Sequence, residues 1–251
     1  MREVSYRFYA TLLDGFQNYM SSSETYHKYY GFSENPSITE EEFEAKAFQD
    51  FINQINRVPF ESEAADRGTA FNEIIDCLIE NRKSERMEIR SDRENGLIIA
   101  TYNGREYSFS LSLCVDTANY YRGALTQVHT TGLLKTRYGN VELYGYIDEL
   151  MPSVIHDIKT TGSYSAFKYK ENWQHKVYPF CLRQQGAMVD EFHYDIFVFD
   201  SKNRFNGRHT EKYLFNEERD TQLLVNQCES LIEFLEMNKA LITDKKVFNN
   251  E

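Results

Sequence analysis

Hydrophobic and polar residues follow two periods along the chain, a helical one toward both ends and a strand-like one in the middle. A repeat of three or four positions predicts amphipathic helices at residues 5–20, 39–55, 68–81, 172–186 and 217–242. Short β-rich runs between turn residues predict strands at 87–90, 96–102, 106–113, 126–135, 192–199 and 209–215. A helix-like stretch at 114–125 interrupts the strands, and the polar, aromatic segment 21–38 predicts a loop.

This order of elements predicts an α/β fold with a central mixed β-sheet flanked by helices, with N-terminal helices and a long C-terminal helix. Apolar residues make up 41% of the 251 residues, and four prolines without a Ser/Gly tract argue against a long linker. We therefore expect one domain over residues 1–251, divided into a helical part at 1–66, a core at 67–215 and the C-terminal helix at 216–251.

The composition also bears on the compartment. The apolar runs are far shorter than the ~18 residues of a membrane span, and the first residues lack the apolar core of a secretory signal. The four cysteines, Cys77, Cys114, Cys181 and Cys228, are far apart in sequence, so they form no C-x-x-C metal signature. We expect a cytoplasmic protein with buried free thiols and no membrane partner.

The net charge of −11 does not favour a nucleic-acid partner, because phosphate contacts need a basic surface. The charge is uneven, however, and residues 155–185 hold five basic and two acidic residues, a net charge of +3. The basic residues of this window are Lys159, Lys168, Lys170, Lys176 and Arg183. An ordinary solvated helix face explains the last four equally well.

Residues 141–161 read as two apolar strands joined by a turn at Pro152 and Ser153. They carry Asp148, Asp157 and Lys159. Because side chains alternate along a strand, Asp157 and Lys159 leave the same face. Charge on an apolar strand is costly unless it is paired or binds a metal. The hairpin therefore predicts either a hard-cation site beside a lysine or a buried structural ion pair.

Polar residues on two helices could complete such a site. The predicted helix at 68–81 follows Arg67 and begins Gly68-Thr69, and its apolar course is interrupted by Asn72, Glu73 and Asp76. In the helix at 172–186, Gln174 and Tyr178 are four residues apart and lie on one face. An ordinary surface pair is the alternative for Gln174 and Tyr178.

Taken together, these segments resemble the PD-(D/E)XK nuclease superfamily, and within it the RecB-like and phage-exonuclease branch. The resemblance rests on four motifs in order: the Gly68-Thr69 helix start, Gly145-Tyr-Ile-Asp148, Asp157-Ile-Lys159, and Gln174-x-x-x-Tyr178. It covers residues 67–199 and implies a restriction-endonuclease-like core. It also implies a deoxyribonuclease that depends on Mg²⁺ or Mn²⁺ and acts as an exonuclease on DNA.

The resemblance also implies roles for individual residues. Asp148 and Asp157 would bind one or two metal ions, helped by the backbone carbonyl of Ile158, and Lys159 would orient the attacking water or neutralise charge. Gln174 and Tyr178 would position the phosphodiester. The four downstream basic residues, Lys168, Lys170, Lys176 and Arg183, would contact the DNA backbone. The iron–sulfur cysteines of some relatives are missing, so we expect no cluster.

One position departs from the family pattern. Four residues after Gly68, where the family has His or Glu, this chain has Asn72, followed by Glu73. Either residue is a candidate third ligand. The departure leaves a second hypothesis, a non-catalytic nucleic-acid-binding or assembly subunit that keeps the fold. The final helix and abundant aromatics also allow a homo-oligomer or a recombination partner protein.

Overall fold

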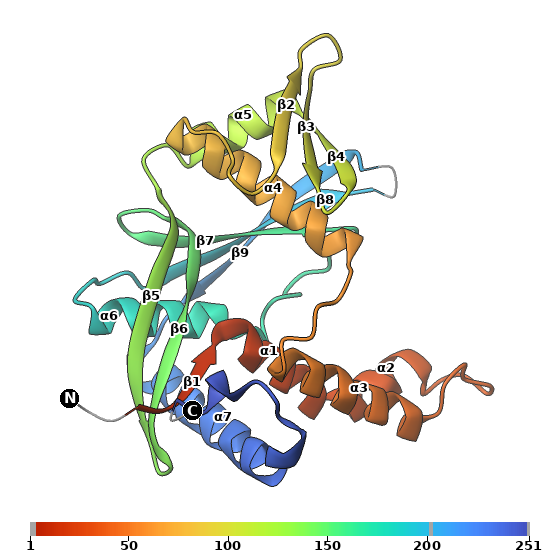
Figure 1. The fold of residues 1–251 in the computed structure, drawn as a ribbon, viewed down its shortest axis with the longest axis vertical. Helices are drawn as coiled ribbons and strands as arrows, with labels where there is room; N and C mark the ends of the chain where they lie inside the picture. The colour runs from red at the N-terminus through yellow and green to blue at the C-terminus, as the bar shows by residue number, and fades with distance from the viewer. Residues whose placement is uncertain (1–3, 201–202, 250–251) are drawn as a thin grey trace.

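The computed structural model describes residues 4–200 and 203–249, so the ends of the expected domain at 1–3 and 250–251 lie outside it. The fold is α/β, with a central mixed sheet flanked by helices as predicted (Figure 1). The main sheet runs in the order β1 (Val4–Tyr9), β6 (Gly139–Leu150), β7 (Val154–Thr161), β8 (Glu191–Phe199) and β9 (Phe205–Leu214), and β5 (Leu125–Thr136) also pairs with β6. The β1–β6 and β7–β8 pairs are parallel, and the others are antiparallel.

A second, three-stranded antiparallel sheet lies beside the main one. It consists of β2 (Glu88–Asp92), β3 (Leu97–Tyr102) and β4 (Arg105–Ser110). The turn between β3 and β4 is the predicted Asn103-Gly104 turn, and both residues have positive φ, as tight hairpins require.

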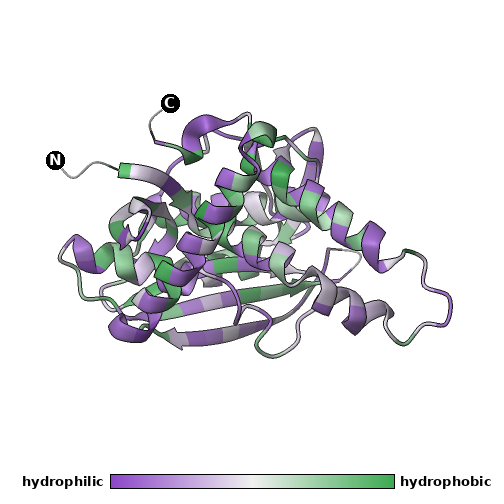
Figure 2. Cartoon of the chain, turned by 90° about the horizontal axis from the view of Figure 1, so that it is seen from below, coloured by the Kyte–Doolittle hydropathy of each residue, from purple (hydrophilic) through white to green (hydrophobic). Residues whose placement is uncertain are grey.

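The helices follow the predicted pattern with three differences. They are α1 (Ala10–Met20), α2 (Ser22–Tyr30), α3 (Glu40–Ile55), α4 (Glu63–Glu80), α5 (Leu111–Tyr120), α6 (Gln174–Gln184) and α7 (Glu217–Met237), followed by 3₁₀ turns at Lys239–Leu241 and Lys245–Val247. α3 begins at the predicted capping box, in which Thr39 and Glu42 bond each other's backbone N–H. Seen from below, the helices carry hydrophilic and hydrophobic bands, as expected for elements with one buried side (Figure 2).

The first difference is that residues 4–9 form a strand, so the helix predicted over 5–20 begins only at Ala10. Pairing with β6 outweighs the helical spacing of the short run around Phe8. The second is that the loop predicted at 21–38 contains α2. Tyr26 and Tyr30 of α2 pack on Phe43 of α3, and this tertiary contact gives a polar segment its buried face.

The third difference concerns Gly68, which does not start its helix. α4 begins at Glu63, where the Ser62 side chain accepts the Ala65 N–H, so Gly68 lies in the second turn. The close approach expected at this glycine is present, because a Cβ there would lie 3.1 Å from Thr160 Oγ1 of β7. The helix therefore crosses β7 at the Gly68-Thr69 motif, although that motif does not mark its beginning.

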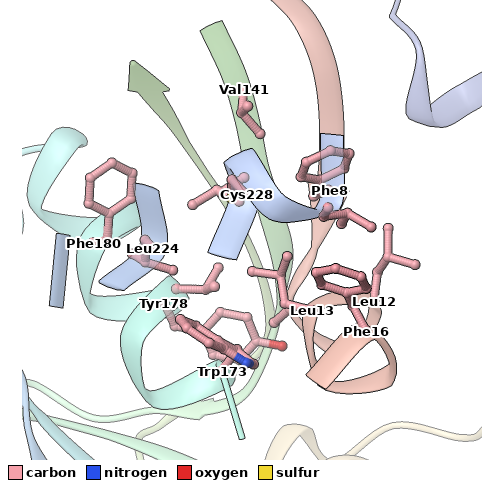
Figure 3. Packing of buried hydrophobic residues seen from close by; sticks show 14 of the residues in the cluster. Phe8, Leu12, Leu13, Phe16, Val141, Trp173, Tyr178, Phe180, Leu224 and Cys228 are labelled. Carbon is pink, nitrogen blue, oxygen red and sulfur yellow. The ribbon is translucent and has the colours of Figure 1, made fainter. Parts of the chain in front are cut away.

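Strands β7 and β8 separate two hydrophobic cores. One core holds Ile155 and Tyr194 and is covered by α1, α3, α6 and α7, and the other holds Ile158 and Phe197 and is covered by α4 and the small sheet. Figure 3 shows the first core, where Phe8, Leu12 and Phe16 lie beside Val141 of β6 and Cys228 of α7. All four cysteines are buried free thiols, as predicted. None of the helices in the described part of the chain is long and apolar enough to cross a membrane.

Candidate functional site

Strand β6 has a gap in its pairing at the Gly145-Tyr-Ile-Asp148 motif. β5 pairs with one edge of β6 along the whole strand. The other edge is shared, because β1 pairs with residues 140–144 and β7 only with Glu149 and Leu150. Residues 145–148 therefore have no strand opposite them on that edge within the described chain. We call residues 145–148 the strand fork.

Asp148 lies at the end of the fork next to β7. Its Oδ2 atom accepts the backbone N–H of Ile158 at 2.9 Å. The same oxygen lies 3.3 Å from Nδ2 of Asn72, which reaches it from α4. A side chain from the fork and one from the crossing helix thus meet at the middle of β7.

Asp157 and Lys159 leave the same face of β7, as their spacing predicted, and Ile158 leaves the other. The Lys159 Nζ atom lies 2.6 Å from Asp157 Oδ2. Gln174, the first residue of α6, joins the two, since its Nε2 donates to Asp157 Oδ1 at 2.6 Å and its Oε1 accepts from Lys159 Nζ at 2.8 Å. The predicted hairpin and helix therefore do meet in one polar centre.

Burial and neighbouring charges both shift the pKa values in this centre. Burial and the nearby Asp157 raise the pKa of Asp148 to about 7. Burial also raises the pKa of Asp157, although Lys159 and Gln174 oppose the shift. Burial lowers the pKa of Lys159, but Asp157 and Asp148 together outweigh it and raise that pKa, so Lys159 stays charged. Two crowded carboxylates beside one ammonium leave an excess of negative charge when both acids ionise.

Tyr178 is packed under the fork rather than directed at solvent. It is buried, and its hydroxyl lies 3.4 Å from Gln174 Nε2. A Cβ added at Gly145 would lie 2.5 Å from Tyr178 Cε1, so only glycine leaves room for the ring. Burial raises the pKa of Tyr178, which therefore stays protonated. Its role in this geometry is to support Gln174.

Glu73 does not join the centre. Its buried carboxylate lies 2.7 Å from Arg82 Nη1 and 3.8 Å from Arg86 Nη1. Both arginines follow the end of α4. Burial raises the pKa of Glu73, but hydrogen bonds with Arg82 and Ser84 lower it by more than burial raises it. The pKa of Glu73 is therefore below its usual value. Between the two candidate third ligands, the structure thus places Asn72 at Asp148 and Glu73 in an ion pair elsewhere.

Buried amide and carboxylate oxygens lie beside the end of the fork. Asn72 Oδ1 has no hydrogen-bond partner among the described residues. Asp157 Oδ2 is held by the Lys159 ammonium at 2.6 Å, and the carboxyl groups of Asp76 and Glu149 bond each other. Buried acceptors are normally satisfied, and hard divalent cations bind such oxygen atoms. The side chains of Asn72, Asp148 and Asp157 therefore fit a Mg²⁺- or Mn²⁺-type ion by donor chemistry.

The four predicted DNA contacts divide into two kinds. Lys168 and Lys170 are exposed on the loop between β7 and α6. Lys176 is half-buried and directs its Nζ at the Asn172 carbonyl oxygen, 3.1 Å away. Arg183 pairs with Asp190 and Glu217, each at 2.8 Å, so its guanidinium is already bound within the protein.

Sequence reasoning missed two acids near the centre, Asp14 and Glu149. Asp14 of α1 accepts the backbone N–H of Trp173 at 2.5 Å, directly before Gln174. Burial raises its pKa to about 6, against the effects of the Trp173 N–H and Lys159. Burial, then Asp76 and Asp148, raise the pKa of Glu149 to about 10. Nothing in the sequence around Asp14 marks it, whereas Glu149 is an acid in an apolar run, as is Asp76, which the sequence did single out.

A second cluster of potential ligands occupies the opposite face of β7 and β8. One ligand atom from each of His156, His193 and Asp195 lies within 4.8 Å of the others, and all three residues are buried. His156 is paired in register with His193 across the two parallel strands. The carboxylate of Asp195 is already engaged by His156, Tyr121, Arg208 and Thr210. These partners fill the acceptor positions of the Asp195 carboxylate, whereas His193 Nδ1 has no hydrogen-bond partner among the described residues.

No protein-family model matches the chain, and no curated protein matches it. One similar solved structure, described as "Crystal structure of SSO0001", has a TM-score of 0.41 and 11% sequence identity. The similarity covers 91% of this chain and 78% of that one. A likeness of this size supports no statement about function.

Proposed function

We propose that this protein is a Mg²⁺- or Mn²⁺-dependent deoxyribonuclease of the PD-(D/E)XK type, acting as an exonuclease. One observation carries the proposal: Asp148 of β6, Asp157 and Lys159 of β7, and Gln174 of α6 meet around one gap in the sheet. Buried acidic oxygens beside a retained lysine suit phosphodiester hydrolysis, in which negative charge must be neutralised. A mixed sheet with helices on both sides is also what a restriction-endonuclease-like core would require.

The side chains have separate tasks in this proposal. Asp148 and Asp157 hold the ion, with the amide oxygen of Asn72 and the carbonyl of Ile158 as neutral donors. When bound, the ion supplies an acidified water and draws charge from the phosphate. Lys159 offers its N–H groups to the attacking water or the phosphate, and the bond to Gln174 fixes its direction.

Gln174 is the first residue of α6, so the partial positive charge of that helix end faces the same centre. Lys168 and Lys170 are the exposed cations nearest in sequence to the centre, and they are the proposed contacts to the DNA backbone. Lys176 is half-buried, Arg183 is held in two ion pairs and Glu73 is paired with Arg82, so none of these three is part of the proposed site. Lys168 also donates to Thr161 and Ser163 of its own segment, but its side chain is exposed.

The test is Mg²⁺-dependent degradation of DNA by the full chain and by Asp157→Asn and Lys159→Ala variants. We expect both variants to lose activity by at least 10²-fold, since each removes a group that acts in the transition state. Lys46→Ala is the matched control, because Glu44-Ala-Lys46 has the same acid-x-lysine spacing and Lys46 lies on the exposed face of α3. Equal activity in the two site variants and the parent overturns the proposal.

The mode of attack is tested separately with linear and closed-circular DNA. An exonuclease degrades the linear form and leaves the closed circle intact, and loss of the circle contradicts this part of the proposal. If Mn²⁺ stabilises the chain but no DNA is cut, the retained acids serve a non-catalytic nucleic-acid-binding subunit instead.

A further inference from the structure

The loop between β7 and α6, residues 162–173, is anchored at both ends by the candidate site (Figure 1). It leaves β7 three residues after Lys159 and enters α6 at Gln174. The loop thus joins two elements that supply residues of the candidate site. The loop is therefore the first segment outside the site in which to look for a substrate contact.

Three of the four aromatic rings in the loop are folded against the protein, and Trp173 is one of them, buried at the end of the loop. Tyr164 stacks on His209 at a ring-centroid distance of 4.4 Å. Tyr169 stacks on Tyr194 at 5.2 Å, and Lys159 Nζ lies 5.7 Å from the same Tyr194 ring. The inner side of the loop is thus continuous with the candidate site.

The fourth ring, Phe167, is presented to solvent. Its side chain is 71% exposed, and its backbone φ is +61°, a left-handed conformation that a bulky residue rarely adopts. Glycine or asparagine would adopt this φ with less strain. A large apolar ring at a strained, exposed position points to a use outside the folded chain itself, because most of the ring faces solvent in the described structure.

Hydrogen bonds hold the loop in this shape. Lys168 Nζ donates to Thr161 Oγ1 at 2.7 Å and to the Ser163 carbonyl at 3.0 Å. The Tyr169 N–H donates to Glu211 Oε2 at 3.2 Å. Phe167 therefore lies on a turn that is already ordered. Less conformational entropy of the loop is then lost when a ligand binds.

The charge of the loop favours a nucleic-acid partner. Lys168 and Lys170 directly follow the exposed ring in sequence, and Glu171 is the one acid of residues 162–173. An exposed aromatic face close to cations suits single-stranded nucleic acid, because bases stack on the ring while phosphates meet the cations. We propose that Phe167 is a stacking platform for a nucleobase of single-stranded DNA led toward the strand fork. The inference rests on the proposed nuclease function and adds a specific substrate contact to it.

The experiment measures binding of a labelled single-stranded oligonucleotide to the full chain, with Asp157→Asn as background to prevent cleavage. We expect Phe167→Leu, which keeps the apolar bulk and the strained φ, to weaken binding by on the order of 10-fold. Phe167→Asn should weaken binding similarly while relieving the strain, and Phe167→Trp should retain affinity. Phe32→Leu is the control, since Phe32 is 96% exposed but lies between α2 and α3.

A second measurement separates stacking from general folding effects. A set of oligonucleotides, each lacking one base, should show a position at which the loss of the base weakens binding to the background chain but not to its Phe167→Leu form. Affinities within twofold of each other for the parent, Leu and Asn forms, or the same penalty for every missing base in both forms, would overturn the stacking role. If the Asp157→Asn chain binds no oligonucleotide, the stacking role is wrong. The proposed nuclease function is a separate matter, and it is wrong only if cleavage by the parent does not depend on Asp157.

Discussion

Asp148 Oδ2 accepts the backbone N–H of Ile158 at 2.9 Å, so a carboxylate holds the edge of β7 at the point where β6 leaves it. The register Glu149–His156 and Leu150–Ile155, if continued, would place Ile147 opposite Ile158. The bond from Asp148 takes the place of that strand contact. Asp148 therefore has two roles. Its oxygen holds the backbone of β7, and its negative charge would bind the proposed metal ion.

These two tasks can be separated by substitution. Asp148→Asn keeps an oxygen for the Ile158 N–H but removes the charge, whereas Asp148→Ala removes both. Without metal, we expect the Asn form to match or exceed the parent stability at pH 8, because it relieves repulsion with Asp157. The Ala form should be less stable than the Asn form by about 1–2 kcal/mol, the cost of an unpaired buried N–H.

The measurement is thermal unfolding in EDTA and in Mn²⁺. Saturating Mn²⁺ at about 100 times its Kd should stabilise the parent by about 3 kcal/mol, and neither variant should gain this. A full metal-induced shift in Asp148→Asn would show that the carboxylate is not a ligand.

Asn72 and Glu73 make a second contrast, because neighbouring helix residues point about 100° apart. Asn72→Ala should weaken the Mn²⁺-induced stabilisation, since it removes the amide that lies on Asp148. Glu73→Gln should leave that stabilisation intact but lower stability without metal by about 2 kcal/mol, because it breaks a buried pair whose Arg82 is one-third exposed. Titration of both variants with Mn²⁺ checks this, and the reverse pattern would return Glu73 to the metal site.

The sequence predicted the centre of the site better than its edges. Alternation along a strand placed Asp157 and Lys159 together, and a four-residue helical repeat placed Gln174 with Tyr178, because both are local properties of the backbone. Whether Asn72 or Glu73 faces the centre depends on Arg82, which pairs with Glu73. Arg82 follows Asn81, whose left-handed backbone ends α4, so the direction of the chain at Arg82 could not be predicted from sequence.

The missed elements have the same cause. β1 is a strand because it pairs with β6 more than 130 residues away, and α2 is a helix because it packs on α3. Asp14 reaches Trp173 across the fold from α1, a helix outside the resemblance. Non-local contacts of this kind leave no mark in the local pattern, and they decide which acids surround the site.

Gly145 tests the packing beneath the fork. Gly145→Ala would place a Cβ 2.5 Å from Tyr178 Cε1, and Tyr178 is buried in α6, so the ring or the helix must shift. We expect a loss of about 1–3 kcal/mol in stability, the usual range for overpacking, and a lower kcat because Gln174 moves with α6. Gly162→Ala is the control, since a Cβ added at Gly162 would lie 3.9 Å from the Phe199 carbonyl oxygen, an ordinary contact distance. Equal unfolding curves for the two variants would contradict this packing.

Asp14 gives a pH-dependent prediction. Its pKa is raised to about 6 in the folded chain, first by burial, from about 3.9 in an unfolded one. The folded state thus binds this proton more tightly, so the contribution of Asp14 to stability is complete below pH ~4 and is lost as pH rises through 6. Asp14→Asn stays neutral and keeps an oxygen for the Trp173 N–H. We therefore expect equal stabilities near pH 4, and an advantage for the Asn form of about 3 kcal/mol at pH 8.

Denaturant unfolding of both forms in EDTA at several pH values measures this difference, and acids common to both chains largely cancel. The charged groups that act on Asp14 are Lys159 and Lys176, which favour its ionised form, and Asp157, which opposes it. If the lysines outweigh burial, the parent is the more stable form at pH 8 and the sign of the difference reverses. That result would make Asp14 a charge partner of Lys159, and substitution of Asp14 should then change the pH profile of cleavage as well as stability.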